Sequence, residues 1–118
     1  MGFVKLARVE EIPLGQTRFF RLEKEPVLLA NFEGNIYALS GLCPHQWNPL
    51  EGAALWGHLV DCPFHHFQFD CRTGENFFPR NVYPKDLPKL ERQLEPLKRY
   101  AVELRDGDVW VNMDHEPS

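Results

Sequence analysis

Four side chains of the kinds that bind soft metal ions occur in two short motifs. The first is Cys43-x-His45, and the second, Cys62-x2-His65, begins after residues 46–61. Cysteine thiolates and histidine imidazoles are common protein ligands of zinc and of iron–sulfur clusters. Because the four side chains form two compact groups that are separated in sequence, a fold can bring the groups to two sides of one centre. The two motifs therefore predict a metal site.

The order of the ligand types distinguishes two kinds of site. Two cysteines and two histidines can hold one tetrahedral zinc ion, or a [2Fe-2S] cluster in which both histidines bind one iron. Zinc fingers usually pair cysteine with cysteine and histidine with histidine, whereas each motif here combines one of each. A mixed motif can give one ligand to each of two iron atoms. The spacing therefore favours a [2Fe-2S] cluster, and a zinc-stabilised interaction module is the alternative.

At these residues the sequence resembles the Rieske family, whose pattern is C-x-H followed at a distance by C-x-x-H. The resemblance continues in Pro63 after the second cysteine, in the aromatic-x-aromatic-Asp run of residues 67–70, and in the turn of residues 73–75. It covers nearly the whole chain. The family's four ligand positions are matched by Cys43, His45, Cys62 and His65. The resemblance implies that these four residues bind the metal here.

The resemblance implies an all-β fold: a Rieske-type antiparallel β-sandwich with a smaller cluster-binding subdomain at about residues 42–71. It also implies one Rieske-type [2Fe-2S] cluster per chain. With 118 residues, the chain is expected to be a single Rieske [2Fe-2S] domain, residues 1–118, because it is too short to add a separate catalytic domain. The implied function is one-electron transfer, without turnover of a substrate by the chain itself.

Two departures from the family pattern concern the reduction potential. High-potential Rieske proteins of respiratory complexes link their two ligand loops by a disulfide, and the matching positions here hold Asn48 and Phe64. The same proteins place a serine and a tyrosine hydroxyl near the cluster sulfurs, where this chain has Phe67 and Phe69. The resemblance is therefore to the low-potential members of the family.

The remaining cysteine and histidines are not expected to be ligands. Cys71 is interpreted as a small buried residue of a strand, which is the usual role of an isolated cysteine. His58 and His115 fall in neither motif. His66 stands where relatives usually carry glycine, and His65 fits the ligand spacing better.

Composition narrows the class of protein further. A content of 43% hydrophobic and 25% charged residues is ordinary for a globular chain, and ten prolines with eight glycines indicate many turns. The formal net charge of −4 argues against nucleic-acid binding, which favours a basic surface. No apolar run approaches the roughly 18 residues of a membrane span. We expect a cytoplasmic protein that binds neither nucleic acid nor membrane.

The rest of the chain has the pattern of an antiparallel β-meander with one helix. Hairpin turns are expected at Glu33-Gly34-Asn35 and at Asp106-Gly107, because glycine and asparagine tolerate the positive φ angles of tight turns. Leucines spaced three and four apart predict a short helix within residues 84–97. Phe77-Phe78-Pro79 is either a third loop against the cluster or an apolar corner. Alternation and turn signals predict strands at residues 3–9, 17–22, 27–32, 36–39, 58–61, 67–70, 100–105 and 109–112.

The resemblance also suggests a place for the chain in electron transfer. It implies the ferredoxin component of a multicomponent oxygenase, which takes electrons from a flavin reductase and passes them to a terminal oxygenase. This step is an analogy at the level of the fold family. The alternative is a cluster-bearing small subunit of another oxidoreductase, such as nitrite reductase. In either case the chain is an electron-transfer component of an oxidoreductase system rather than a self-sufficient enzyme.

Overall fold

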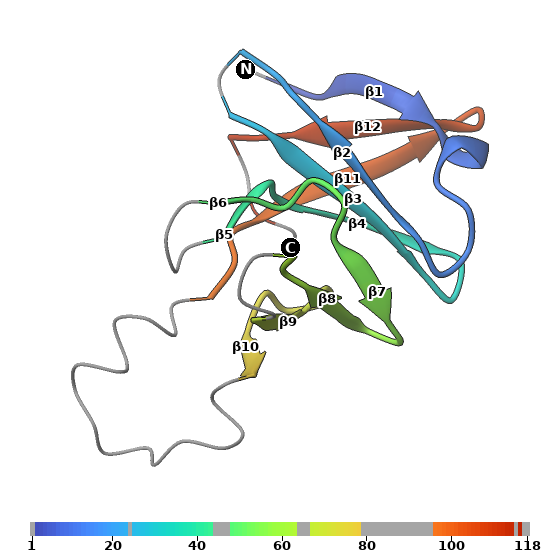
Figure 1. Cartoon of the computed structure of the whole chain (residues 1–118). Coiled ribbons are helices and arrows are strands. Elements are labelled where there is room, and N and C mark those ends of the chain that lie inside the picture. The colour runs from blue at the N-terminus through green and yellow to red at the C-terminus, as the bar shows by residue number, and fades with distance from the viewer. Residues whose placement is uncertain are drawn as a thin grey trace.

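The computed structural model describes residues 2–23, 25–43, 48–63, 67–78, 96–114 and 116. Over these residues the chain forms antiparallel β-structure and one 3-10 helix, η1 (Val9–Glu11). Six strands form the largest sheet, in the order β1-β12-β11-β4-β3-β2 (Figure 1). Their bounds are β1 Val4–Arg8, β2 Thr17–Phe20, β3 Val27–Phe32, β4 Asn35–Ser40, β11 Arg99–Arg105 and β12 Asp108–Asn112.

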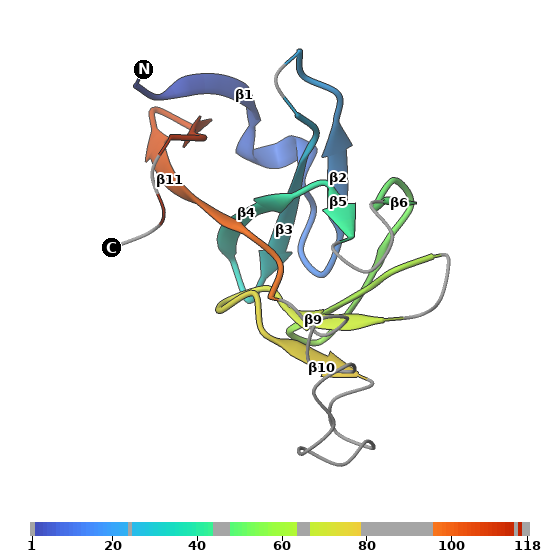
Figure 2. The ribbon, with the colours of Figure 1, turned by 90° about the vertical axis from the view of Figure 1, so that its left-hand side faces the viewer.

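Two smaller sheets lie beside the large one (Figures 1 and 2). A four-stranded sheet has the order β10-β9-β8-β7, and a two-stranded sheet pairs β5 with β6. These strands are β5 Leu42–Cys43, β6 Asn48–Pro49, β7 Ala54–Trp56, β8 Leu59–Asp61, β9 Gln68–Asp70 and β10 Asn76–Phe78. All the smaller strands come from the stretch between β4 and β11, so one insertion into the large sheet supplies the smaller part of the fold.

Strand β3 joins the two parts because it is buried on both faces. Leu28 and Ala30 belong to a core shared with the small sheets, whereas Val27 and Leu29 belong to a core enclosed by the large sheet itself. Side chains alternate between the two faces of a strand, so consecutive buried residues must serve two different cores. This explains why the strand is a continuous apolar run rather than an alternating one.

The all-β antiparallel fold class predicted from the sequence is confirmed. The predicted strands are present with small shifts at their ends. Both predicted hairpin turns are present as well: φ is 55° at Glu33 and 88° at Gly34, and 51° at Asp106 and 81° at Gly107. Two consecutive residues with positive φ match the twist of the flanking strands, as in type I′ turns. The turn residues therefore set the register of both hairpins.

Some parts of the fold were not predicted, and one prediction stays untested. The short strands β5, β6, β7 and β10 had no strand prediction, and β10 contains the Phe77-Phe78 pair. Most of the predicted helix within residues 84–97 lies outside the described residues, because the structure does not describe residues 79–95. Residues 96–98, which are described, are not helical. Among the described residues, no helix is long and apolar enough to cross a membrane.

Gly74 attaches the four-stranded sheet to the segment that leads into β11. Its N–H donates to the carbonyl of Asp70 at 2.7 Å, and its own carbonyl accepts from the N–H of Leu97 at 2.6 Å. The φ angle of Gly74 is +80°, and a Cβ added there would lie 2.1 Å from the Leu97 carbonyl oxygen. A side chain at this position therefore meets both an unfavourable φ and a backbone clash.

We expect Gly74→Ala to lower the free energy of unfolding by clearly more than the ~1–2 kcal/mol that positive φ alone costs a non-glycine residue. Gly34→Ala is the matched control, because Gly34 also has positive φ, +88°, but open space where the Cβ would be. Thermal or denaturant unfolding of the two variants measures the difference. Equal losses would show that the contact with Leu97 does not constrain the position.

Candidate metal centre

The first ligand motif begins at the end of strand β5. Cys43 is the last residue of β5, and its Cα partner is Asn48, the first residue of β6. The pairing continues toward the core, where the N–H of Leu50 donates to the carbonyl of Gly41 at 2.7 Å. Cys43 is only 2% exposed. The hairpin thus holds the Cys43 side chain in the interior, at the base of the first loop.

The second ligand motif begins directly after strand β8. Cys62 directly follows β8, and its N–H donates to the carbonyl of Phe67 at 2.8 Å, which closes the loop. Asp61 and Gln68 form the next pair in the ladder, and the Gln68 Nε2 donates to the Asp61 Oδ2 at 3.1 Å. Cys62 is 1% exposed. The second loop therefore begins, like the first, with a buried cysteine held by a hairpin.

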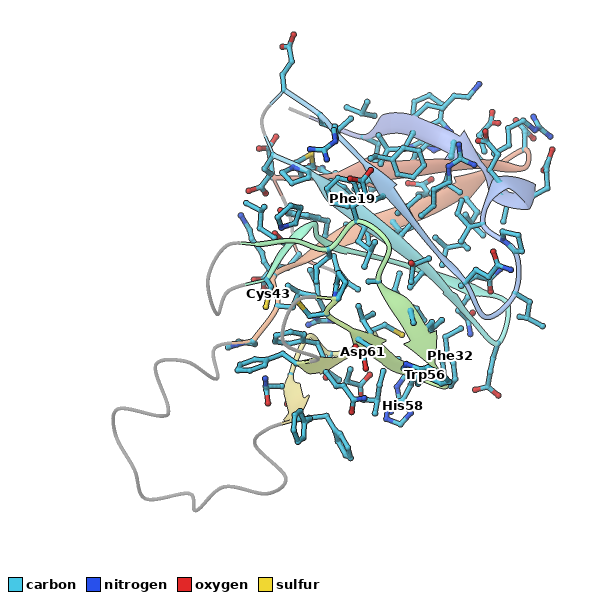
Figure 3. All side chains as sticks on the ribbon, viewed as in Figure 1. Phe19, Phe32, Cys43, Trp56, His58 and Asp61 are labelled. Carbon is cyan, nitrogen blue, oxygen red and sulfur yellow. The ribbon has the colours of Figure 1, made fainter. Side chains whose placement is uncertain are left out.

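Both cysteines belong to the same buried cluster, and none of the three cysteines of the chain forms a disulfide. In Figure 3, Cys43 lies between the large sheet and the four-stranded sheet. Two thiols at the bases of two loops, with little access to water, suit a soft metal, because thiolates bind iron and zinc strongly. The donor set therefore fits an iron–sulfur cluster. The apolar residues of the buried core that contains the cysteines are Leu28, Ala30, Leu39, Leu50, Ala53, Val60, Phe69 and Leu97.

The other two predicted ligands, His45 and His65, lie in residues 44–47 and 64–66, outside the described residues. By chain connectivity each histidine belongs to the same loop as a buried cysteine. Within the described ranges, no three metal-binding side chains are grouped together. The structure thus brings the cysteine half of the predicted ligand set into one core and leaves the histidine half as a prediction.

Cys71 is buried but lies away from the second loop. It follows β9, whereas Cys62 precedes the loop that leads into β9, so the two cysteines are at opposite ends of this strand. Its N–H donates to the carbonyl of His58 at 2.8 Å. Burial raises the pKa of the Cys71 thiol to about 12, so the thiol stays protonated at neutral pH. The predicted role of Cys71 as a small buried residue is confirmed, although it lies in a turn and not in a strand.

His58 lies at that same end of the four-stranded sheet. Its ring packs edge-on against Phe32 with 6.0 Å between centroids, and its Nε2 lies 3.9 Å from the Asp70 Oδ2 (Figure 3). These contacts account for His58 without a metal. His66 and His115 lie outside the described residues.

The Phe77-Phe78 pair forms an edge strand, β10, instead of a loop. The register pairs Phe78 with Gln68, the residue that opens β9 directly after the second loop. Phe78 therefore lies at the ligand end of the four-stranded sheet, and Phe77 is 44% exposed. Pro79, the third residue of the predicted loop or corner, lies outside the described residues.

The hydrogen bond between Gln68 and Asp61 was not predicted from the sequence. Its only sequence signal is position, because Asp61 precedes Cys62 and Gln68 follows the aromatic residue Phe67. The strand register was needed to show that the two residues face each other across the base of the loop.

Comparison with known proteins identifies the family. The Rieske [2Fe-2S] domain matches residues 2–88 of the chain. The biphenyl dioxygenase ferredoxin subunit of Pseudomonas sp. (strain KKS102) is 30% identical over 113 residues, which is 95% of this chain and 93% of that protein. Sulredoxin of Sulfurisphaera tokodaii is 31% identical over 94 residues, 80% of this chain and 81% of that protein.

Solved structures agree on the fold. The ferredoxin of carbazole 1,9a-dioxygenase from Nocardioides aromaticivorans IC177 superposes with a TM-score of 0.74 over 100% of both chains, at 22% identity. A ferredoxin from Sphingomonas yanoikuyae B1 gives 0.74 at 24% identity, covering 95% of this chain and 99% of that chain. The chain belongs to the Rieske [2Fe-2S] family, and its cofactor is a Rieske-type [2Fe-2S] cluster. The prediction of an electron carrier of the Rieske ferredoxin type is confirmed.

Proposed function

We propose that the chain is the ferredoxin component of a multicomponent oxygenase system. In this role it takes single electrons from a flavin reductase and passes them to a terminal oxygenase. The proposal is supported by relatives that are ferredoxin subunits of biphenyl and phenylpropionate dioxygenases and match this chain over most of its length. These relatives favour an oxygenase system over a nitrite reductase small subunit. The bound cluster supplies the one-electron redox chemistry.

The proposed ligands are Cys43 and Cys62 for one iron and His45 and His65 for the other. The observation that carries this assignment is the matching position of the two cysteines, each buried at the base of a hairpin loop and in one core. Each histidine follows its cysteine by two or three residues, so it is further along the chain from β5 or β8 than the cysteine is. The cysteines would then hold the inner iron, and the histidines the outer one.

The packing around the cysteines is suited to an electron carrier. Leu50, Val60 and Phe69 have no exposed surface and belong to the same core as both cysteines. Such packing keeps water from the thiolates, and it limits the rearrangement that would slow electron transfer when the charge changes. The chain's own contribution is therefore to hold the two cysteine ligands rigidly in the core.

The proposal includes a single Rieske domain spanning residues 1–118, with residues of about 42–71 as its cluster-binding part. Strands β5–β9, which fall within that range, connect to the large sheet through β4 on one side. It also includes a cytoplasmic location. A site of this kind needs reduced cysteines, and the cytoplasm keeps thiols reduced.

The direct test is to purify the chain and measure its metal and its electron transfer. We expect two iron atoms per chain, the stoichiometry of one [2Fe-2S] cluster, a reddish-brown colour, and reduction by a nicotinamide nucleotide only when a flavin reductase is present. Mixing the reduced protein with an oxidised terminal oxygenase that has its own Rieske centre should reoxidise it rapidly in a stopped-flow experiment. A colourless protein that contains zinc would support the interaction module instead. An iron protein that reduces no oxygenase would contradict the proposed partner.

A further inference from the structure

Asp61 and Gln68 form a side-chain pair across the base of the second ligand loop. Asp61 is the last residue of β8 and Gln68 the first of β9, and the two are Cα partners in the antiparallel ladder. The Gln68 Nε2 donates to the Asp61 Oδ2 at 3.1 Å in a half-buried position. Asp61 immediately precedes Cys62 in sequence. A carboxylate that accepts a hydrogen bond from a neutral amide therefore lies one residue before a proposed iron ligand in the sequence.

The pair lies on the outer face of the four-stranded sheet. Val60 and Phe69, the neighbours of Asp61 and Gln68 along their strands, have no exposed surface and point into the core. Since side chains alternate along a strand, Asp61 and Gln68 point to the opposite face. Ala54, which is exposed, is the Cα partner of Asp61 on the edge strand β7. Figure 3 shows Asp61 within this sheet.

The position of the carboxylate has an electrostatic consequence. Reduction adds one negative charge to an iron–sulfur centre, so a nearby negative charge disfavours the reduced state. A half-buried position makes the interaction stronger than in bulk water, because the surrounding dielectric constant is lower. The hydrogen bond from Gln68 restricts the orientation of the Asp61 carboxylate, and so it helps to keep the negative charge at a constant distance from the centre.

We propose that the Asp61–Gln68 pair lowers the reduction potential of this protein: Asp61 supplies the negative charge, and Gln68 positions it. The inference rests on the proposed function, because it takes Cys62 to be an iron ligand. The effect of the pair on the reduction potential adds to the one predicted from Phe67 and Phe69, which comes from missing hydrogen-bond donors and not from charge. Gln68 is a positioning residue, because it acts through Asp61.

The test is the midpoint potential of the loaded protein, measured by voltammetry or by equilibrium with a reference dye. We expect Asp61→Asn, which keeps the size of the side chain, to favour the reduced form about threefold to tenfold relative to wild type, where tenfold corresponds to 59 mV for a one-electron couple. Gln68→Leu keeps the charge but removes the hydrogen bond from the Gln68 amide to it, so its shift should have the same sign and be smaller. In the Asp61→Asn background, Gln68→Leu should add almost nothing, because the charge to be positioned is gone.

Asp70→Asn is the matched control, because it removes the same charge from the other end of β9. Asp70 accepts hydrogen bonds from the Arg72 Nε at 3.1 Å and from its Nη2 at 3.0 Å, and it is eight residues beyond Cys62. Its shift should be less than half that of Asp61→Asn. Equal shifts would mean that only net charge matters, and they would overturn the proposal.

A second pair of variants decides the question if Asp61→Asn fails to retain its cluster. Ala54→Lys and Ala54→Glu place opposite charges beside Asp61 on an exposed edge strand, where either side chain is accommodated. The lysine should raise the potential and the glutamate should lower it. Shifts of one sign, or none, would overturn the electrostatic account. A wild-type protein without Rieske spectral features would instead contradict the proposed function, so the two failures are distinguishable.

Discussion

Replacing Cys43 or Cys62 by alanine is expected to abolish cluster binding, with iron content and visible absorbance falling to background in either single variant. Each substitution removes a thiolate from the proposed inner iron, and both positions are almost completely buried, at 2% and 1% exposure. Water has little access to replace the lost ligand. His45→Ala and His65→Ala should also lose the Rieske spectrum, because each removes half of the proposed ligands of the outer iron.

Cys71→Ala is the matched control for these variants, because Cys71 is equally buried and belongs to the same core. It should keep full iron content, with a loss of stability of about 1 kcal/mol, which is typical of a small change in a core. Iron analysis and thermal unfolding of the variants separate the two effects. Full iron content in Cys62→Ala, or loss of iron in Cys71→Ala, would contradict the ligand assignment.

The hairpins of the large sheet could be predicted because their turn residues are specific. The Glu33-Gly34 and Asp106-Gly107 turns need positive φ at both positions, and glycine is the residue that adopts it most easily. Strand β3 was recognisable as a continuous apolar run, although its burial in two separate cores follows only from the packing. In these elements local sequence and tertiary structure favour the same conformation.

The short strands of the cluster-binding part could not be predicted, for a physical reason. Strands β5 and β6 have two residues each, and β7 and β10 have three, so none is long enough to show an alternating pattern. Their conformation depends on pairing with neighbours, as when β10 pairs with β9. At the site, too, contacts that depend on strand pairing could not be predicted from the sequence. Ligand spacing identified the two motifs, but the hydrogen bond between Gln68 and Asp61 depends on a register that composition does not reveal.

The reduction potential of the wild-type protein is expected to be low for a Rieske centre. Rieske centres span roughly −150 to +300 mV, and hydrogen-bond donors to the sulfurs raise the potential because they stabilise the more negative reduced state. Phe67 and Phe69 have no side-chain donor. With the Asp61 carboxylate also one residue before Cys62 in sequence, we expect a midpoint in the low part of that range, about −150 to 0 mV. A midpoint measured by voltammetry well above about +100 mV would contradict both the missing donors and the carboxylate as causes of a low potential.

Phe69→Tyr tests the donor argument at a single position. Phe69 has no exposed surface and shares one core with Cys43 and Cys62, so an added hydroxyl would be enclosed near the thiolates. If the hydroxyl donates to a sulfur, a hydrogen bond worth about 1 kcal/mol in the reduced state should raise a one-electron potential by roughly 40 mV. If it reaches no acceptor, burying it should cost about 1–3 kcal/mol of stability. Measuring potential and unfolding together separates these outcomes, since a less stable variant with unchanged potential would place the ring away from the sulfurs.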